Sequence, residues 1–479
     1  MVVGEMVQEC QLVVIGAGPG GYTAALRAAE LGIKTMLVES TPKPGGTCLH
    51  VGCIPSKALL HAAEVIGEAK AAEGFGLSFG KPKIEIDKLR AWKESILDKL
   101  SGGIAGKCKS AGVEIVKGTA LFKDNRNVRV EADGESAVRI KFKQCIIATG
   151  SRPVLPKMFD IGSARVMDST GALALQDIPK SLLIVGGGYI GLEMGTVYAA
   201  LGSEVTVVEM TDGLLPGVDR DLVRPLQQHL QSEFKAIYLN TKVAKVEDSG
   251  KGVKAYLEGK DVPAEMTFDR VLVSVGRRPN TDNLGLDVAG VKLDQQGFIV
   301  IDEECRTSEK RIFAIGDCSG QPMLAHRAIR QGIVAAEVIA GKKSAFDNRV
   351  IPAVVFTQPE IAYVGLTDGE AKAKGIEVGT VKMPWSANGR AHTLAEPTGQ
   401  TKILFDPATT QVLGIGLVGP RAGELVSEAA VAIEMGAVLE DLAVSIHTHP
   451  TLSETIMESA YSALSRIERQ AKRETSSVS

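Results

Sequence analysis

Two cysteines lie five residues apart in the segment Gly45-Gly-Thr-Cys48-Leu-His-Val-Gly-Cys53-Ile-Pro-Ser-Lys57. Such a pair could be inert, could ligate zinc, or could cycle between dithiol and disulfide. No second Cys or His pair lies nearby in the sequence, and zinc pairs are usually closer together, so a metal is disfavoured. Five residues of regular α-helix rise about 7.5 Å, beyond the usual Cα separation of a disulfide, so the turn must be distorted. A strained, accessible pair near a helix N-terminus has a lowered thiol pKa and suits a catalytic dithiol.

The elements that must hold this pair come directly before it. Leu12–Ile15 is a short apolar run typical of a buried parallel strand, and a glycine turn follows at 16–21. Residues 22–31 carry alanines at helical spacing, and Lys34–Glu39 has the pattern of a second strand. The sequence therefore predicts a strand, a turn, a helix and a strand before the cysteines.

The glycines of that turn have chemical roles. Gly16 permits the tight turn, Gly18 lets the backbone approach a pyrophosphate, and Gly21 lets helix and strand pack closely while the helix N-terminus faces the anion. Glu39 ends the second strand, where an acid accepts hydrogen bonds from the ribose of an adenosine dinucleotide. A lone GxGxxG is a weak signal, but strand, helix and acid in register favour a dinucleotide site over a plain glycine turn.

The same unit recurs in the middle of the chain. A strand at Ser181–Val185 precedes the turn Gly186-Gly-Gly188-Tyr189-Ile190-Gly191, and another strand ends in Glu209. Glu209 follows Gly191 by 18 residues, as Glu39 follows Gly21. The sequence therefore predicts two dinucleotide sites on duplicated domains.

The two repeats also end in similar sequences, and the acid of the second repeat indicates which nucleotide binds there. Apolar strands lead to Gly150-Ser-Arg-Pro in the first repeat and to Gly276-Arg-Arg-Pro in the second. NADP sites place an Arg near the end of the second strand, whereas Glu209 would repel a 2′-phosphate and can bond a free 2′-hydroxyl. We therefore expect NAD rather than NADP.

Composition excludes several other classes of function. The 479 residues are 44% hydrophobic and 23% charged, as in globular chains, and the length predicts about three domains. A formal charge of −3 offers no basic field for nucleic acid. Seven cysteines are too few for a secreted disulfide framework, and the first eleven residues lack Lys and Arg, so we expect a cytoplasmic protein. No uninterrupted apolar stretch approaches the ~18 residues of a membrane span.

The segment GGTCLHVGCIPSKALL, placed between two nucleotide fingerprints, resembles the flavin-dependent pyridine nucleotide-disulfide oxidoreductases. The likeness covers nearly the whole chain. Residues 312–317 match the second FAD motif of that family, and Pro322-Met-Leu-Ala-His326 follows as it does there. Residues 351–365 resemble the opening of its interface domain, and 447–454 match its catalytic His-Pro motif.

The resemblance implies a role for each residue of the redox chemistry. Cys48 would be the interchange thiol that substrate attacks, and Cys53 the thiol that faces the flavin. His449 would be the base that takes a proton from the substrate dithiol, oriented by Glu454. Within the family the motifs are most similar to those of members that oxidise protein-bound dihydrolipoyl groups with NAD⁺.

The resemblance also implies the cofactor contacts. Lys57 and Glu193 match the pair beside the flavin ring, and Tyr189 stands where some relatives place an aromatic lid that nicotinamide displaces. The expected FAD contacts are Gly16, Gly18, Gly21, Glu39, Lys57, Gly150, Asp317 and Ala325. The expected NAD contacts are Gly186, Gly188, Tyr189, Ile190, Gly191, Glu209 and Gly276.

Some of these residues have simpler interpretations. Thr451-x-x-Glu454 is also a capping box, so Glu454 could start a helix as well as orient the base. His447 and His449 could bind a metal, but no carboxylates stand at ligand spacing, and we expect no metal site. His50 departs from the Asn that relatives usually carry. The other five cysteines have no partner motif and are expected to be buried small hydrophobes.

The expected fold is α/β, with two Rossmann-like nucleotide-binding domains for FAD and NAD and a C-terminal α+β dimerisation domain. We expect an FAD domain at 1–150, an NAD domain at 151–280, a central segment returning to FAD at 281–348 and an interface domain at 349–479. A homodimer would serve lipoyl-bearing protein domains of a 2-oxoacid dehydrogenase or glycine-cleavage complex. The alternatives are an NAD(P)H-dependent reductase of another small disulfide and a non-catalytic flavoprotein subunit.

Overall fold

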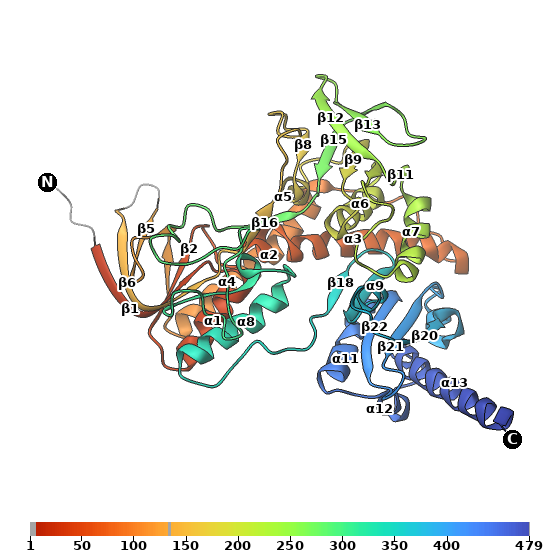
Figure 1. Cartoon of the computed structure of the whole chain (residues 1–479). Coiled ribbons are helices and arrows are strands. Elements are labelled where there is room, and N and C mark those ends of the chain that lie inside the picture. Colours follow the sequence, from red (N-terminus) through yellow and green to blue (C-terminus); the bar gives the residue numbers. More distant parts are fainter. Residues whose placement is uncertain (1–5, 133–135, 479) are drawn as a thin grey trace.

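The computed structural model describes residues 6–132 and 136–478. Figure 1 shows three bodies: an N-terminal one in red and orange completed by a later teal segment, a yellow-green one, and a blue C-terminal one. No helix among the described residues is long and apolar enough to cross a membrane.

The N-terminal body is built on a seven-stranded sheet in the order β3-β2-β1-β6-β5-β4, with β17 beside β6. Its strands are β1 (Met6–Ile15), β2 (Thr35–Glu39), β3 (Glu114–Lys117), β4 (Thr119–Phe122), β5 (Asn127–Glu131), β6 (Val138–Ile147) and β17 (Ile312–Ala314). β1 pairs in parallel with β2 and β6 and lies between them, so its apolar run is buried on both faces: Leu12, Val13 and Val14 have no exposed surface.

Helices cover this sheet and carry the cysteine segment. They are α1 (Pro19–Glu30), α2 (Gly46–Val51), α3 (Cys53–Ala71), η1 (Ala72–Phe75), α4 (Ile86–Ser110), η2 (Gly316–Ser319) and α8 (Ala325–Ile339). The distortion expected between the cysteines occurs at Gly52, which separates α2 from α3 with φ −148° and ψ −117°. A side chain there would bring its Cβ within 2.8 Å of the Thr47 carbonyl oxygen, so the break requires glycine.

The middle body repeats the plan with a five-stranded sheet in the order β11-β10-β9-β15-β8. The strands are β8 (Val166–Met167), β9 (Ser181–Val185), β10 (Glu204–Val208), β11 (Ala236–Tyr238) and β15 (Arg270–Val273), and the helices are α5 (Ser169–Ala174), α6 (Tyr189–Leu201) and α7 (Arg220–Glu233). A separate antiparallel sheet contains β12 (Lys242–Asp248), β13 (Val253–Glu258) and β14 (Glu265–Phe268). The two nucleotide-type bodies are joined by a two-stranded ribbon of β7 (Ser151–Pro153) and β16 (Arg277–Pro279).

The C-terminal body is an antiparallel sheet in the order β18-β19-β22-β21-β20 with helices packed on it. Its strands are β18 (Ala353–Val355), β19 (Glu360–Gly365), β20 (Gly379–Pro384), β21 (Gln400–Phe405) and β22 (Val412–Gly419). Its helices are α9 (Asp368–Lys374), η3 (Trp385–Ala387), α10 (Gly389–Thr393), α11 (Ala422–Glu434), α12 (Leu439–Val444) and α13 (Glu454–Val478).

The order of elements shows how the chain is divided. β17 and α8 fall within 281–348, yet β17 extends the first sheet beside β6 and α8 packs against α1. Residues 281–348 therefore return to the N-terminal body. The boundaries 1–150, 151–280, 281–348 and 349–479 stay proposed divisions of the chain.

Candidate active site

The two glycine turns have the same local geometry. A Cβ added at Gly21 would lie 1.8 Å from the Gly16 carbonyl oxygen, and one added at Gly191 would lie 2.4 Å from the Gly186 oxygen. No side chain fits at either position, because the helix packs directly on the turn that precedes it. Each turn therefore presents its backbone and a helix N-terminus, the arrangement that binds pyrophosphate.

The two acids at the strand ends are also held alike. Glu39 Oε2 accepts from Ala17 N at 2.8 Å, and Oε1 accepts from Thr41 N at 2.8 Å and Thr41 Oγ1 at 2.9 Å. Glu209 accepts from Gly187 N at 2.6 Å and from Thr211 N and Oγ1 at 2.8 Å each. Both acids are buried. The threonines were missed by sequence reasoning, although the repeated Glu-x-Thr pattern is visible in the chain.

One cavity of about 770 Å³ is lined both by the first glycine turn and by the cysteine pair. Every expected FAD residue lines it: Gly16, Gly18, Gly21, Glu39, Lys57, Gly150, Asp317 and Ala325. Cys48, Cys53, Tyr189, Ile190 and Glu193 also line it. The other expected NAD residues, Gly186, Gly188, Gly191, Glu209 and Gly276, belong to the second turn and strand ends and lie outside this cavity.

The cysteine end of the cavity carries a charged pair. Lys57 Nζ lies 2.8 Å from Glu193 Oε2 and 4.3 Å from the centre of the Phe356 ring, and Glu193 Oε1 accepts from Phe356 N at 3.1 Å. The Glu193 side chain is only 4% exposed, whereas that of Lys57 is 33% exposed. The lysine therefore satisfies a buried carboxylate and also faces the cysteines.

The two thiols are not equivalent. Both cysteines are free, with Cys53 exposed and Cys48 half-buried. A hydrogen bond from Cys48 lowers the pKa of Cys53 to about 7, and the charge of Lys57 acts in the same direction against burial and Glu193. The same hydrogen bond and burial raise the pKa of Cys48. In the dithiol, Cys53 is therefore the more acidic thiol, and Cys48 stays protonated and donates to it.

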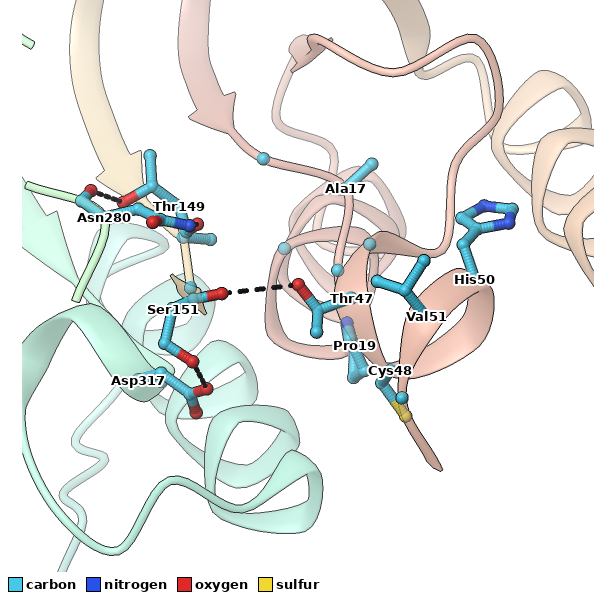
Figure 2. Close-up of a pocket in the computed structure, with 18 of the residues that line it drawn as sticks. Ala17, Pro19, Thr47, Cys48, His50, Val51, Thr149, Ser151, Asn280 and Asp317 are labelled. Atoms are coloured by element: carbon cyan, nitrogen blue, oxygen red, sulfur yellow. Dashed lines mark hydrogen bonds between the residues drawn. The ribbon is translucent and has the colours of Figure 1, made fainter. Parts of the chain in front are cut away.

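Ser151 connects several walls of the cavity, as Figure 2 shows for its bonds to Thr47 and Asp317. Its hydroxyl donates to Asp317 Oδ2 at 2.5 Å, and Arg277 donates to the Ser151 hydroxyl at 2.9 Å and to its carbonyl at 2.8 Å. Thr47 Oγ1, next to Cys48, lies 3.5 Å from the Ser151 carbonyl. Sequence reasoning noticed the matched strand ends that carry Ser151 and Arg277 but assigned neither residue a role.

The cavity suits a flavin dinucleotide from end to end. The glycine turn lies where a pyrophosphate needs N–H donors, and the Glu39 carboxylate lies where a ribose needs an acceptor. Asp317, which accepts from the Ser151 hydroxyl, lines the same cavity. The side chains that would meet the redox-active ring are Cys53, Lys57 and Glu193.

His449 is held by Glu454 but lies away from this cavity. His449 Nδ1 is 2.8 Å from Glu454 Oε1, and Glu454 Oε2 accepts from Thr451 N at 2.7 Å. The Thr451 N–H and the His449 ring both lower the pKa of Glu454. Glu454 is the first residue of α13 and also holds the imidazole. Of the predicted capping box only the bond from Thr451 N to Glu454 forms, because the Thr451 hydroxyl bonds to the Thr448 carbonyl and to Ser453. The His449 side chain is 79% exposed on the C-terminal body.

Two other histidines, His447 and His50, are hydrogen-bonded to groups away from His449. His447 has Nε2 2.7 Å from Glu428 Oε1 and Nδ1 2.9 Å from the Ser445 carbonyl. His50 has Nε2 3.1 Å from the Pro44 carbonyl and lines the cavity.

The five cysteines outside the pair are buried, as expected: Cys10, Cys108, Cys145, Cys305 and Cys318.

Among the residues that the structure describes, one acidic trio has the spacing of metal ligands: Asp219, Asp221 and Asp368. It surrounds Lys402, whose Nζ lies 2.8 Å from Asp219 and 3.2 Å from Asp221 and contacts Asp368 as well. The Lys402 side chain has no exposed surface. The charged ammonium group of Lys402 therefore lies among the three carboxylates, and these ion pairs join the middle body to the C-terminal one.

Comparison with known proteins agrees with this geometry. Residues 10–332 match the model of the pyridine nucleotide-disulphide oxidoreductase family, and residues 351–460 match that of its dimerisation domain. The chain is 48% identical over 449 residues to a dihydrolipoyl dehydrogenase of Vibrio parahaemolyticus, covering 94% of both chains. It is 48% identical over 446 residues to that of Haemophilus influenzae, covering 93% of both.

Solved structures are similar over the same length. LpdA of Mycobacterium tuberculosis superposes with a TM-score of 0.87 at 28% identity, covering 94% of this chain and 99% of that one. The HOCl-induced flavoprotein disulfide reductase RclA of Escherichia coli gives a TM-score of 0.84 at 27% identity, with the same coverage. The predicted α/β fold is thereby confirmed. The chain belongs to the pyridine nucleotide-disulphide oxidoreductase family, whose members bind FAD and a nicotinamide dinucleotide and end in a dimerisation domain.

Proposed function

We propose that the protein is a dihydrolipoyl dehydrogenase, which oxidises the dihydrolipoyl dithiol of lipoyl-bearing protein domains to the disulfide with NAD⁺. The observation that carries this proposal is the pair of unequal thiols at the end of the dinucleotide cavity, with a Cys53 pKa of about 7 beside Lys57. Dihydrolipoyl dehydrogenases at 48% identity over 94% of the chain support it.

The side chains account for the thiol chemistry. With Nδ1 bonded to Glu454, His449 is free to take a proton from the substrate dithiol at Nε2. The resulting thiolate attacks Cys48 of a Cys48–Cys53 disulfide, and Cys53 leaves as a thiolate that Lys57 stabilises. The second substrate thiol then attacks the substrate sulfur of the mixed disulfide, which releases the cyclic disulfide and leaves Cys48 as a thiol.

The two electrons now held by the Cys53 thiolate and Cys48 thiol must leave as a pair. Bound FAD supplies the carrier that passes them as hydride to NAD⁺. The chain's part in this step is to hold Cys53 as the thiolate at the cavity end and to keep the Lys57–Glu193 pair beside the ring. Tyr189, which is 42% exposed at the start of α6 and lines the cavity, would cover the approach of the nicotinamide.

We propose a homodimer in which His449 of the partner subunit completes the site. His449 is exposed and lies outside the cavity that holds Cys48. The C-terminal body also exposes large apolar side chains, among them Val431, Met435, Val444, Ile446 and Tyr461. A second copy would bury this surface and bring the imidazole to the disulfide.

We propose NAD as the nucleotide because the buried Glu209 carboxylate repels a 2′-phosphate. We also propose a cytoplasmic location, since the five other cysteines are buried free thiols and such thiols persist in reducing compartments.

The likeness to RclA favours a second candidate function, the reduction of another small disulfide. Turnover of dihydrolipoamide with NAD⁺, compared with NAD(P)H-dependent reduction of a panel of small disulfides, separates the two functions.

Mixing two inactive variants tests the shared site. Homodimers of Cys48→Ser and of His449→Gln should each be nearly inactive with dihydrolipoamide and NAD⁺. Random reassembly of equal amounts gives about half heterodimers, each with one intact site of two, so about a quarter of parent activity should return. If the sites lay within single chains, every site would carry one lesion, and mixing would restore nothing.

A further inference from the structure

The acid that ends the second nucleotide strand is held by three internal donors. Glu209 Oε2 accepts from Gly187 N at 2.6 Å, and Oε1 accepts from the amide and the hydroxyl of Thr211 at 2.8 Å each. The Thr211 hydroxyl also lies 3.0 Å from the Gly213 carbonyl, so its single hydrogen is shared between carboxylate and loop. An ionised carboxylate accepts about four hydrogen bonds, which leaves room for about one from a ligand.

The backbone that presents the Thr211 hydroxyl is itself anchored. The Thr211 carbonyl accepts from Asn240 N at 2.9 Å, and the Glu209 carbonyl accepts from Thr241 N at 3.0 Å. Farther along the loop, Leu215 N donates to the Gly187 carbonyl at 2.9 Å. Thr211 therefore holds the carboxylate from a fixed point, while its own side chain lies on the exposed surface.

We propose that Thr211 is a positioning residue that determines nucleotide specificity by fixing the Glu209 carboxylate toward the 2′-hydroxyl of the adenosine ribose. This inference rests on the proposed function, in which the second glycine turn binds NAD. Without the hydroxyl, the Glu209 carboxylate keeps its bonds from the Gly187 and Thr211 amides but is held less firmly, so more of its motion must be lost when NAD binds and it excludes a 2′-phosphate less strictly. The hydroxyl thus contributes both to NAD affinity and to discrimination against NADP.

The first nucleotide unit supplies a matched control within the same chain. Thr41 holds Glu39 with the same set of bonds, and its hydroxyl lies 3.0 Å from the Lys43 carbonyl. The Gly45 amide donates to the Ala17 carbonyl at 2.9 Å, as the Leu215 amide donates to the Gly187 carbonyl in the second unit. Replacing Thr41 by Val makes the same chemical change at a site that faces FAD.

The test compares flavin-loaded Thr211→Val, Thr211→Ser, Thr41→Val and Glu209→Gln enzymes with the parent. Thr211→Val should raise KM for NAD⁺ about five- to ten-fold with kcat unchanged, and lower the NAD⁺/NADP⁺ ratio of kcat/KM by a similar factor, as loss of one hydrogen bond whose hydrogen is shared with the Gly213 carbonyl implies. Thr211→Ser keeps the hydroxyl and should retain the parent ratio. Thr41→Val should leave the ratio unchanged and speed flavin loss on dilution several-fold.

The outcomes separate this inference from the function on which it rests. If Glu209→Gln lowers the ratio but Thr211→Val leaves it within about two-fold of the parent, the role of Thr211 is wrong and the NAD site stands. If Thr211→Ser behaves like Thr211→Val, or if Thr41→Val shifts the ratio equally, the hydroxyl is not the cause. If Glu209→Gln leaves the ratio unchanged, the second turn is not the nicotinamide nucleotide site, and that part of the proposed function fails.

Discussion

The charged pair at the cavity end should adjust the pKa of Cys53 beyond the larger effect of the Cys48 hydrogen bond, and two substitutions should move that pKa in opposite directions. Lys57 stabilises the Cys53 thiolate, and Glu193 opposes it. Lys57→Met removes the cation and leaves the buried Glu193 carboxylate without its partner at 2.8 Å, so the Cys53 pKa should rise. Glu193→Gln removes the opposing anion and should lower it.

The expected size follows from the position of Lys57 one helical turn after Cys53. Side chains at that spacing lie about 6 Å apart, where a unit charge pair at an effective dielectric of about 20 interacts by about 3 kcal/mol. Because Lys57 is one-third exposed, solvent screening leaves roughly half of this energy, or about one pKa unit. The Cys53 pKa should therefore rise from about 7 to about 8, and thiolate at pH 7 should fall about five-fold.

The assay is the pH dependence of alkylation by iodoacetamide in anaerobically reduced holoenzyme, with the modified cysteine located by mass spectrometry. The rate follows the thiolate fraction, so a lowered pKa means that Cys53 reacts fully above pH 7 and slowly below it. Lys70→Met serves as control because Lys70 lies on the same helix but over ten residues beyond the site, farther than a Debye length.

Two results would refute the reasoning. An alkylation pKa that moves by less than about 0.3 units in Lys57→Met would mean that Lys57 does not act on the thiolate. Shifts of the same sign in Lys57→Met and Glu193→Gln would mean that disruption of the pair, rather than its charges, controls Cys53.

Two further substitutions test the packing that supports the site. Lys402→Met leaves the aspartates around it without their cation and should lower the free energy of unfolding by about 3 kcal/mol in urea, whereas Lys70→Met, at an exposed ion pair with Glu233, should cost less than about 1 kcal/mol; equal effects would contradict this account. Gly21→Ala drives a Cβ into the Gly16 carbonyl and should yield protein with little bound flavin, whereas Gly103→Ala, with open space around it on α4, should keep its flavin absorbance; full flavin content in Gly21→Ala would show that the turn tolerates a side chain.

The local units of this protein could be predicted from its sequence. Glycines at 16, 21, 186 and 191 indicated turns without room for side chains, because that constraint acts within a few residues. The 18-residue spacing to Glu39 and Glu209 indicated where each acid would meet its ligand, since strand and helix lengths are regular. The helix break between the cysteines could likewise be expected, because five residues of regular helix are too long for a disulfide.

How these units meet depends on the tertiary packing. Ser151 joins Thr47, Arg277 and Asp317, which lie more than 100 residues from it along the chain, and Lys402 gathers aspartates from two bodies. Such contacts depend on how sheets and helices pack, and no local propensity encodes them. The structure also places His449 outside the cavity of its own chain, because the position of a whole body on its neighbours is set by long-range packing rather than by residue spacing.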